Sequence, residues 1–211
     1  MQFALRKINI ISQTDILNAE DGERGRIELN LMLKGMMKHK NLWRHTQGAV
    51  SLVASTGSYV LSPNPYRIIM CQYRNTSSID IPMFPLTRTE YYELPMKTST
   101  GLPTNYYFDP QRDTGTLLVW PVPANVTTET IQYTYQRRFE DVSNLEQTID
   151  ITQEGLEVVG YSLASRLTMD YGQFGPPIDA VNAKAGQLLQ EFLDQDRAEI
   201  VRFAPDYRYG I

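Results

Sequence analysis

The sequence has few of the residues from which catalytic and metal sites are most often built. A single cysteine among 211 residues, Cys71, excludes a disulfide framework and a paired-cysteine metal or redox motif. The two histidines, His39 and His45, have no cysteine near them in the sequence, which disfavours a zinc site. No phosphate-binding glycine loop, GxSxG or HExxH pattern occurs. We therefore expect neither a metal nor a cofactor.

Long apolar runs are also missing. No stretch approaches the roughly 18 apolar residues that a membrane span needs, so no membrane span is expected. Residues 1–7 lack the basic-then-apolar layout of a signal peptide, which predicts a protein that is made and kept in a reducing cytoplasm. With 42% hydrophobic and 21% charged residues, the composition excludes a disordered or fibrous chain.

Charge is distributed unevenly along the chain. The net charge of −4 argues against affinity for nucleic acid through bulk charge. Residues 1–48 hold eight basic and five acidic residues, residues 49–140 hold seven of each, and residues 141–211 hold five basic and twelve acidic ones. The three segments therefore carry +3, 0 and −7. Solvated helix faces explain such a skew without any function.

Both ends of the sequence have helical periodicity. Apolar residues at the i, i+3, i+4, i+7 spacing predict a helix over residues 21–40, with a shorter apolar piece over residues 3–11 packed against it. Two more helices are predicted after residue 150, the first with Asp150 or Thr152 as its N-cap and the second beginning near Ile178. The predicted apolar stripes are Leu29, Met32, Leu33 and Met36; Leu156, Val159, Leu163 and Leu167; and Val181, Ala185, Leu188, Leu189 and Phe192.

Between the helical ends the periodicity is that of strands. Alternation over residues 50–54, a turn at 55–58 and the run 59–61 predict a β-hairpin. Further strands are predicted over residues 67–73, 79–84, 106–108, 116–120 and 131–137. In the last of these, Ile131, Tyr133 and Tyr135 face one way, which is the pattern of a half-buried strand. Cys71 lies in an apolar strand and is expected to pack as a small hydrophobic residue.

The order helix, sheet, helix predicts an α+β fold. Since neither helical end is long enough to form a good core alone, we predict one helical bundle built from the N- and C-terminal segments. An antiparallel β-sandwich or barrel is then inserted into that bundle. The predicted divisions are residues 1–46 and 140–202 for the bundle, 47–139 for the β-domain and 203–211 for an extended C-terminal tail.

Two other function classes stay open on the residues alone. The carboxylate pairs Asp109 with Asp113 and Glu90 with Glu93 suggest a weak polysaccharide hydrolase, because glycoside hydrolysis needs two carboxylates across a cleft. Surface solvation is the simpler explanation of both pairs. Most of the thirteen tyrosines lie in the predicted β-domain, and such a surface suits sugar stacking or protein interfaces. A module that binds host glycan is therefore the second alternative.

The middle of the chain resembles a known family. The runs GLPTNYYFDP at residues 101–110, GTLLVWPVP at 115–123 and YTYQR at 133–137 resemble the β-domain of head-to-tail adaptor proteins of tailed phages, also called tail tubular protein A or gateway proteins. The resemblance extends from about residue 5 to residue 192. Its signature positions are Gly101, Pro103, Tyr106, Tyr107, Gly115, Trp120, Pro121 and Pro123.

The resemblance implies a structural role without enzymatic activity. Members of this family form a ring, typically dodecameric, that docks beneath the portal of the filled capsid and extends the DNA channel towards the tail. The implied partners are other copies of this chain, the portal protein, a nozzle or other tail protein, and double-stranded DNA that passes without specific binding. The implied location is the head-to-tail junction of the virion, after assembly in the host cytoplasm.

Two surfaces are predicted to serve this role. Aromatic and aliphatic residues near the C-terminus would anchor the chain to the portal, namely Phe203, Tyr207, Tyr209 and Ile211. Acidic residues of the last two helices would line the channel, where negative walls repel DNA phosphates so that the duplex slides without sticking. The predicted channel residues are Glu154, Glu157, Glu191 and Asp194.

Overall fold

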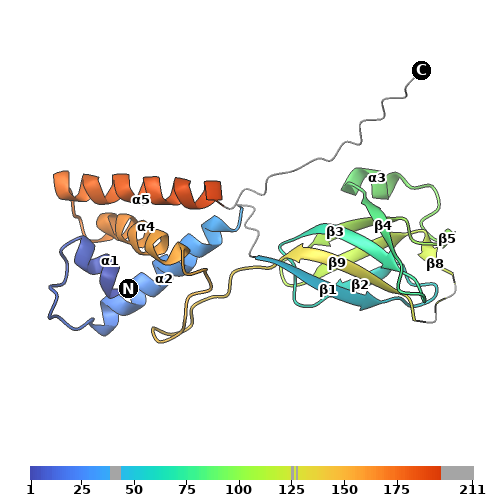
Figure 1. Cartoon of the computed structure of the whole chain (residues 1–211), viewed down its shortest axis with the longest axis horizontal. Coiled ribbons are helices and arrows are strands. Elements are labelled where there is room, and N and C mark those ends of the chain that lie inside the picture. The colour runs from blue at the N-terminus through green and yellow to red at the C-terminus, as the bar shows by residue number, and fades with distance from the viewer. Residues whose placement is uncertain (39–43, 125, 127, 196–211) are drawn as a thin grey trace, which may run out of the picture.

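The computed structural model describes residues 1–38, 44–124, 126 and 128–195. Helices from both ends of the chain lie together as one group, separate from a seven-stranded sheet to which the chain connects them, so the fold is mixed α+β (Figure 1). The helices outside the sheet region are α1 (Gln2–Lys7), α2 (Ala19–Met36), α4 (Gly155–Asp170) and α5 (Pro176–Gln195).

These four helices share one hydrophobic core. α4 packs against α1, α2 and α5, and buried residues of all four helices form a single cluster. Phe3 of α1 covers Gly160 of α4 and stacks edge-on against Tyr161, with the ring centroids 5.4 Å apart. The short N-terminal piece thus packs chiefly on α4, whereas the sequence predicted α2 as its support. Segments that are more than 100 residues apart in the chain are joined in this way.

Local sequence signals account for α2. Asn18 caps its N-terminus by accepting a hydrogen bond from the Asp21 N–H at 2.7 Å. Acidic residues in the first turn and Lys34 in the last turn complement the helix dipole. The predicted apolar stripe is confirmed, because its four members are all buried: Leu29, Met32, Leu33 and Met36.

The start of α4 differs from the prediction. Its N-cap is Glu154, which makes no capping hydrogen bond through its side chain, so neither Asp150 nor Thr152 is the N-cap. The Asp150 carboxylate instead accepts hydrogen bonds from Arg137, while Thr152 contributes its carbonyl oxygen to the Gly155 N–H. Leu156 of the predicted stripe is also 49% exposed, since the buried face is centred on its neighbours Val158 and Val159.

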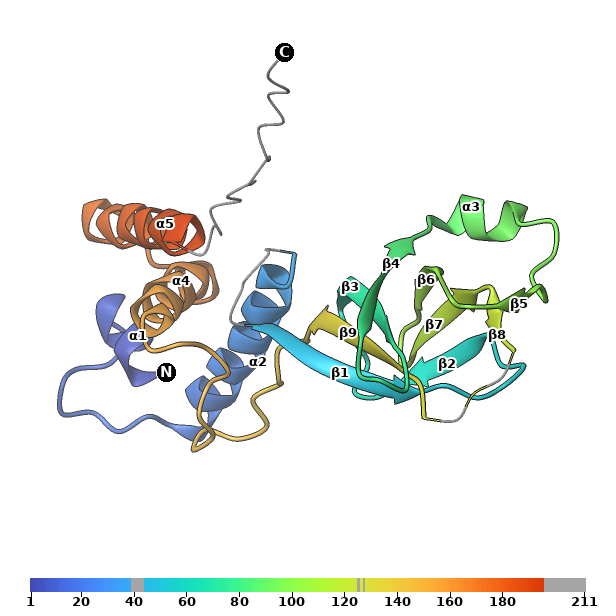
Figure 2. The same cartoon turned by 45° about the vertical axis from the view of Figure 1, so that its right-hand side comes forward.

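The sheet has the strand order β1-β9-β3-β4-β6-β7-β2 and curls around a core of its own (Figure 2). A separate two-stranded piece pairs β5 with β8. The bounds are β1 His45–Ser51, β2 Ser58–Leu61, β3 Arg67–Arg74, β4 Asp80–Pro85, β5 Thr100–Gly101, β6 Asn105–Pro110, β7 Gly115–Trp120, β8 Val122–Pro123 and β9 Thr130–Gln136. The five strands predicted after residue 66 are confirmed, each within three residues of its bounds.

Two predictions about the sheet are wrong. The sheet is not wholly antiparallel, because β4 pairs with β6 in parallel, as β5 does with β8. The predicted hairpin of the first two strands is also absent, since β1 pairs with β9 and β2 pairs with β7. The loop between β1 and β2 closes one turn, in which the Thr56 N–H donates to Val53 O at 3.1 Å, but it does not pair the two strands. Its other backbone bonds go to distant segments: the Leu52 N–H donates to Glu129 O at 3.0 Å, and the Ser55 N–H donates to Pro123 O at 2.8 Å.

A short helix between β4 and β6 was not predicted. This helix, α3 (Arg88–Glu93), begins with a capping box in which Thr87 and Glu90 exchange side-chain and backbone hydrogen bonds. It has no buried residue, so the apolar spacing on which helix prediction depends is absent. The ring of Tyr91 stacks on Tyr107 of β6 with centroids 5.5 Å apart, which holds the helix to the sheet.

The core of the sheet takes up much of the tyrosine content. Five tyrosines belong to its buried cluster: Tyr59, Tyr73, Tyr106, Tyr133 and Tyr135. Ile131, Tyr133 and Tyr135 share one face of β9, as predicted. Cys71 is 1% exposed in the same cluster, and burial raises the pKa of its thiol to about 12, which confirms its role as a packing residue. These tyrosines fill the core and offer no sugar-stacking surface.

Candidate functional site

A buried arginine lies where the chain passes between the helices and the sheet. Arg44, directly before β1, is 0% exposed. Its Nε and Nη2 donate to the carbonyl oxygen of Arg137 at 3.1 and 2.8 Å, and its Nη1 donates to that of Met37 at 3.5 Å. The guanidinium also lies over the Phe139 ring, 4.3 Å from its centroid. One side chain therefore ties the residue after α2 to the residue after β9.

An ion pair extends this contact towards α4. Arg137 binds the Asp150 carboxylate through both terminal nitrogens, with Nη2 2.6 Å from Oδ1, and the Glu140 N–H also donates to Asp150 at 3.2 Å. Burial lowers the pKa of Arg44 to about 10, and the nearby charge of Arg137 adds to this, yet the group stays charged at neutral pH. We call Arg44, Arg137, Phe139 and Asp150 the junction cluster.

Asp150 gives the junction cluster a predictable dependence on pH. Burial by itself raises the pKa of this carboxyl, but the hydrogen bonds from Arg137 and the Glu140 N–H outweigh it, so the pKa lies below its ordinary value. A lowered folded-state pKa means that the stabilisation is complete above the unfolded pKa of about 4 and is lost as the pH falls through the folded value. We expect Asp150→Asn to remove part of the acid-induced loss of stability.

Urea unfolding at a series of pH values between 2 and 7 measures this effect. Asp113→Asn is the matched control, because the Asp113 side chain is 84% exposed and its nearest cation, Arg112, is 94% exposed. The control should retain the acid dependence of the unchanged protein. If the free energy of unfolding of Asp150→Asn varied with pH in the same way as that of the unchanged protein, the ion pair would contribute nothing to the acid-induced loss of stability.

The family-signature positions lie in or beside the strands of the sheet region. Tyr106 and Tyr107 are buried in β6, and the Trp120 Nε1–H donates to the Met96 carbonyl oxygen at 3.0 Å. A Cβ atom on Gly115 would lie 2.6 Å from the Phe108 ring, so only glycine fits there without a shift. The remaining positions, Gly101, Pro103, Pro121 and Pro123, lie on or beside the β5–β8 pair.

Three signature residues also line a hollow at one end of the sheet. Gly101, Pro103 and Pro123 surround a space of about 300 Å³ together with Leu52, Tyr73 and other mostly apolar residues. Charged side chains are absent from the described lining of this hollow. Without a charged side chain in its described lining, the hollow offers no carboxylate or cationic group for acid–base chemistry on a substrate.

The predicted channel-lining residues come together in space. Glu154 and Glu157 lie at the start of α4, while Glu191 and Asp194 lie at the end of α5, and all four are exposed. α4 and α5 pack along each other in opposite directions, so these two ends are adjacent (Figure 1). A Cβ atom on Gly155 would be 3.2 Å from the Phe192 ring, which shows how closely the ends approach. Their role in a channel stays a prediction.

The predicted portal anchor cannot be placed in the same way. Its four residues, Phe203, Tyr207, Tyr209 and Ile211, lie outside the described residues, as does His39. Portal binding by this segment therefore also stays a prediction.

Three of the four carboxylates considered for hydrolysis make local contacts, and the fourth, Glu93, is exposed at the end of α3. Asp109 accepts hydrogen bonds from the Tyr107 hydroxyl at 3.3 Å and from Gln111 at 2.8 Å, while Asp113 lies beside Arg112 on an exposed turn. Glu90 is used in the capping box of α3. In the described part of the chain, none of these carboxylates lines a recess beside α1, the hollow beside the β5–β8 pair or two smaller hollows. Nothing in their placement favours hydrolysis.

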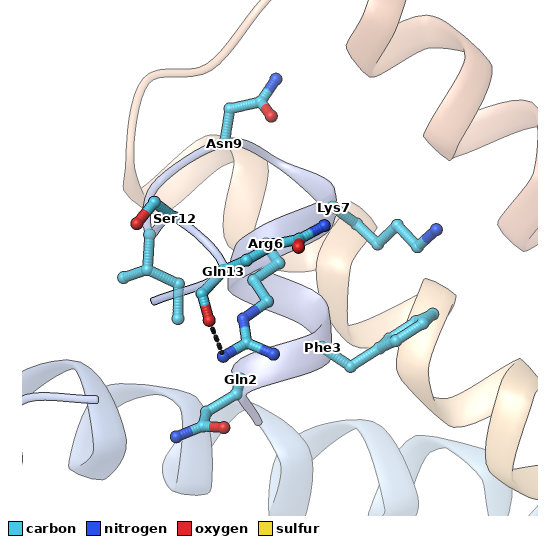
Figure 3. A pocket seen from close by; sticks show the side chains of 8 residues that line it. Gln2, Phe3, Arg6, Lys7, Asn9, Ser12 and Gln13 are labelled. Carbon is cyan, nitrogen blue, oxygen red and sulfur yellow. Dashed lines mark hydrogen bonds between the residues drawn. The ribbon is translucent and has the colours of Figure 1, made fainter. Parts of the chain in front are cut away.

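Sequence reasoning missed a basic recess beside α1 (Figure 3). The recess has a volume of about 620 Å³. Arg6 projects into it and donates from Nη2 to the Gln13 carbonyl oxygen at 3.0 Å, while the Lys7 ammonium lies 5.1 Å from the Phe3 ring centroid. The adjacent basic residues at the end of an apolar piece were the available signal. The lining residues are Gln2, Phe3, Arg6, Lys7, Asn9, Ile11, Ser12 and Gln13.

Comparison with known proteins identifies the family. The family described as SU10 adaptor protein matches residues 22–207, which include most of the helices and the whole sheet. The chain belongs to the SU10 adaptor protein family. The adaptor part of the resemblance is thereby confirmed, while the narrower designation of tail tubular protein A stays a prediction.

Other comparisons add less. A solved structure described as the neck of an empty GTA particle computed with C6 symmetry matches 83% of this chain and 81% of its own, with 10% sequence identity and a TM-score of 0.33. No curated protein matches the chain in sequence.

Among the described helices, none has the length and apolar character to cross a bilayer. The described part of the chain also brings together no group of three or more His, Cys, Asp or Glu side chains suited to a metal ion.

Proposed function

We propose that this SU10 adaptor family protein is a structural head-to-tail connector of a tailed phage. It forms a ring beneath the portal, extends the DNA channel and offers its lower face to the nozzle or another tail protein. The observation that carries this proposal is the family match over residues 22–207. The proposal includes the predicted dodecameric ring, assembly in the host cytoplasm, a position at the head-to-tail junction of the virion, and no enzymatic activity.

The distribution of the two cores supports the predicted division of the chain. One core contains residues from both helical ends, and the other contains only residues from the sheet region. We propose that residues 1–46 and 140–202 act as one wall-forming unit and that residues 47–139 act as a second unit pointing away from the portal. The junction cluster supports a fixed angle between them, because Arg44 donates to backbone carbonyls of both units and Arg137 binds the Asp150 carboxylate.

The two predicted surfaces complete the proposal. Residues 203–211 bind the portal, and the acidic ends of α4 and α5 face the channel. The exposure of Glu154, Glu157, Glu191 and Asp194 at one end of the helix pair supports the second role. Like charges on a wall and on phosphates repel, so DNA would pass without being held.

A depletion experiment tests the proposed function. Phage production without this chain should yield DNA-filled heads and free tails that are not joined, and supplying the chain in trans should restore joined particles. Joined, infectious particles in its absence would contradict the proposal. Particles with complete necks that fail only at attachment to cells would favour the glycan-binding alternative instead.

A further inference from the structure

The outer face of α2 is apolar at its centre and basic towards its C-terminal end. Ile27 is 47% exposed and Leu31 is 52% exposed, although both lie on a helix whose opposite face is well buried. Arg24 lies one turn before them, where it pairs with Glu20 and lies over the Tyr171 ring. Lys34, which pairs with Asp141, and Lys38, just beyond the end of α2, follow with exposed side chains. An apolar centre with charged ends is the composition of an interface core with a polar rim.

The outer face of α5 has the complementary pattern. Its centre carries the small exposed residues Ala183 and Gly186, and a Cβ atom added to Gly186 would meet no atom within 4 Å. Exposed carboxylates lie at both ends of this face, Asp179 in the first turn and Asp194 near the last. The exposed side chains of Gln187 and Gln190 border this centre and donate hydrogen bonds to Glu191 and Asp194, so the open space lies over Gly186 itself.

The two faces also match in length and direction. At 1.5 Å per residue, Arg24 and Lys34 are separated by about 15 Å along α2, and Asp179 and Asp194 by about 23 Å along α5. Lys38 lies two residues beyond the end of α2 and extends the basic end of this face. Both helices run from the end far from the sheet towards it, and α4 packs against both (Figure 1, Figure 2). When the helices of two copies run in the same direction, Arg24 meets Asp179, Ile27 and Leu31 meet Ala183 and Gly186, and Lys38 meets Asp194.

We infer that the outer face of α2 in one copy of this chain packs against the outer face of α5 in the next copy. Because the two faces are different surfaces of one chain, the contact is heterologous: each copy uses both, and the contact repeats until a ring closes. The inference rests on the proposed ring and supplies its subunit contact. It also assigns Asp194 to the contact between copies, whereas the channel prediction assigned it to the wall.

Cysteine cross-linking of the full chain tests the contact. A chain that carries both Ile27→Cys and Ala183→Cys is oxidised at pH 8 and run on a denaturing gel. The native thiol does not interfere, because Cys71 is buried and its pKa is raised to about 12. We expect a ladder of dimers, trimers and larger species. A mixture of the two single-cysteine chains should stop at dimers, and each single-cysteine chain alone should stay monomeric.

The matched control replaces the α2 position with one on the sheet. Arg112 is 94% exposed on the turn between β6 and β7, so a chain with Arg112→Cys and Ala183→Cys should form no ladder. Dimers but no larger species from the Ile27→Cys, Ala183→Cys chain would indicate a two-fold contact and overturn the inference. Oligomers that are detected by sedimentation but are not cross-linked would overturn this contact between copies without contradicting the proposed ring. Monomers at every concentration would overturn the inference, while the adaptor role would still be decided by the depletion experiment.

Charge reversal gives an independent readout. Lys38→Glu and Asp194→Lys should each weaken self-association roughly 3- to 10-fold in sedimentation equilibrium, because each places like charges opposite one another. The double variant should return to within about 3-fold of the unchanged chain. Arg112→Glu, a reversal of the same size away from the contact, should have no effect. Additive losses in the double variant would contradict the pairing of Lys38 with Asp194.

Discussion

Replacing Arg44 with alanine is expected to lower the free energy of unfolding by about 3–5 kcal/mol. The side chain is fully buried, so its loss leaves a cavity as well as carbonyl oxygens of Met37 and Arg137 without their charged donor. It also removes the cation over the Phe139 ring and leaves Arg137 and Asp150 beside the gap. The expected loss is a large part of the stability of an ordinary domain.

Urea titration followed by circular dichroism measures the loss. Arg44→Lys keeps a charge but cannot reproduce the forked geometry with which Nε and Nη2 share one carbonyl oxygen, so it should recover less than half of the loss. Arg112→Ala, which removes an arginine that is 94% exposed, should change the free energy of unfolding by less than about 0.5 kcal/mol. A loss below about 1 kcal/mol for Arg44→Ala would show that the junction cluster does not hold the two parts of the chain.

Replacing Gly115 with valine should lower the free energy of unfolding by about 2–4 kcal/mol. A Cβ atom at this position would lie 2.6 Å from the Phe108 ring and 2.9 Å from Asn64 Oδ1, so a valine has to displace both neighbours. Gly115 begins β7 and pairs with Pro110 on one side and Leu61 on the other, which leaves the backbone little room to move. The displacement therefore disturbs three strands at once.

Gly186→Ala is the matched control for this substitution. Gly186 lies inside α5 with no atom within 4 Å of an added Cβ, so alanine should raise the free energy of unfolding by up to about 1 kcal/mol through its higher helix propensity. Thermal unfolding of the two variants distinguishes the cases. A Gly115→Val protein as stable as the unchanged chain would show that this signature glycine is not required by packing.

The features that the sequence predicted well depend on local spacing. The stripe of α2 repeats every three or four residues, and the alternation of Ile131, Tyr133 and Tyr135 spans five, so each pattern is complete within one element. The predicted start of the last helix near Ile178 also lies within two residues of the start of α5. Gly172 and Gly175, which precede it, adopt positive φ angles of 60° and 110° that favour glycine. Pairing of α4 and α5 then follows from the short connection.

The features that the sequence could not predict depend on contacts between distant residues. The expected hairpin was wrong because residues 52–57 bond to strands more than 60 residues later, and no local signal marks that choice. The sequence did not mark Arg44 as a buried residue, because the carbonyl oxygen that it binds lies 93 residues away in the chain. An exposed arginine before a strand would give the same local pattern. The fold brings the two helix ends that carry the channel candidates next to each other, and their place in a channel stays a prediction.

One measurement tests the connector role most directly. The full chain is mixed with the portal protein of the same phage, and the mixture is imaged by negative-stain electron microscopy. We expect a closed ring of this chain bound coaxially to the portal, with residues 47–139 of each copy farthest from the portal. A portal that carries no added density, or single copies bound without closing into a ring, would contradict it.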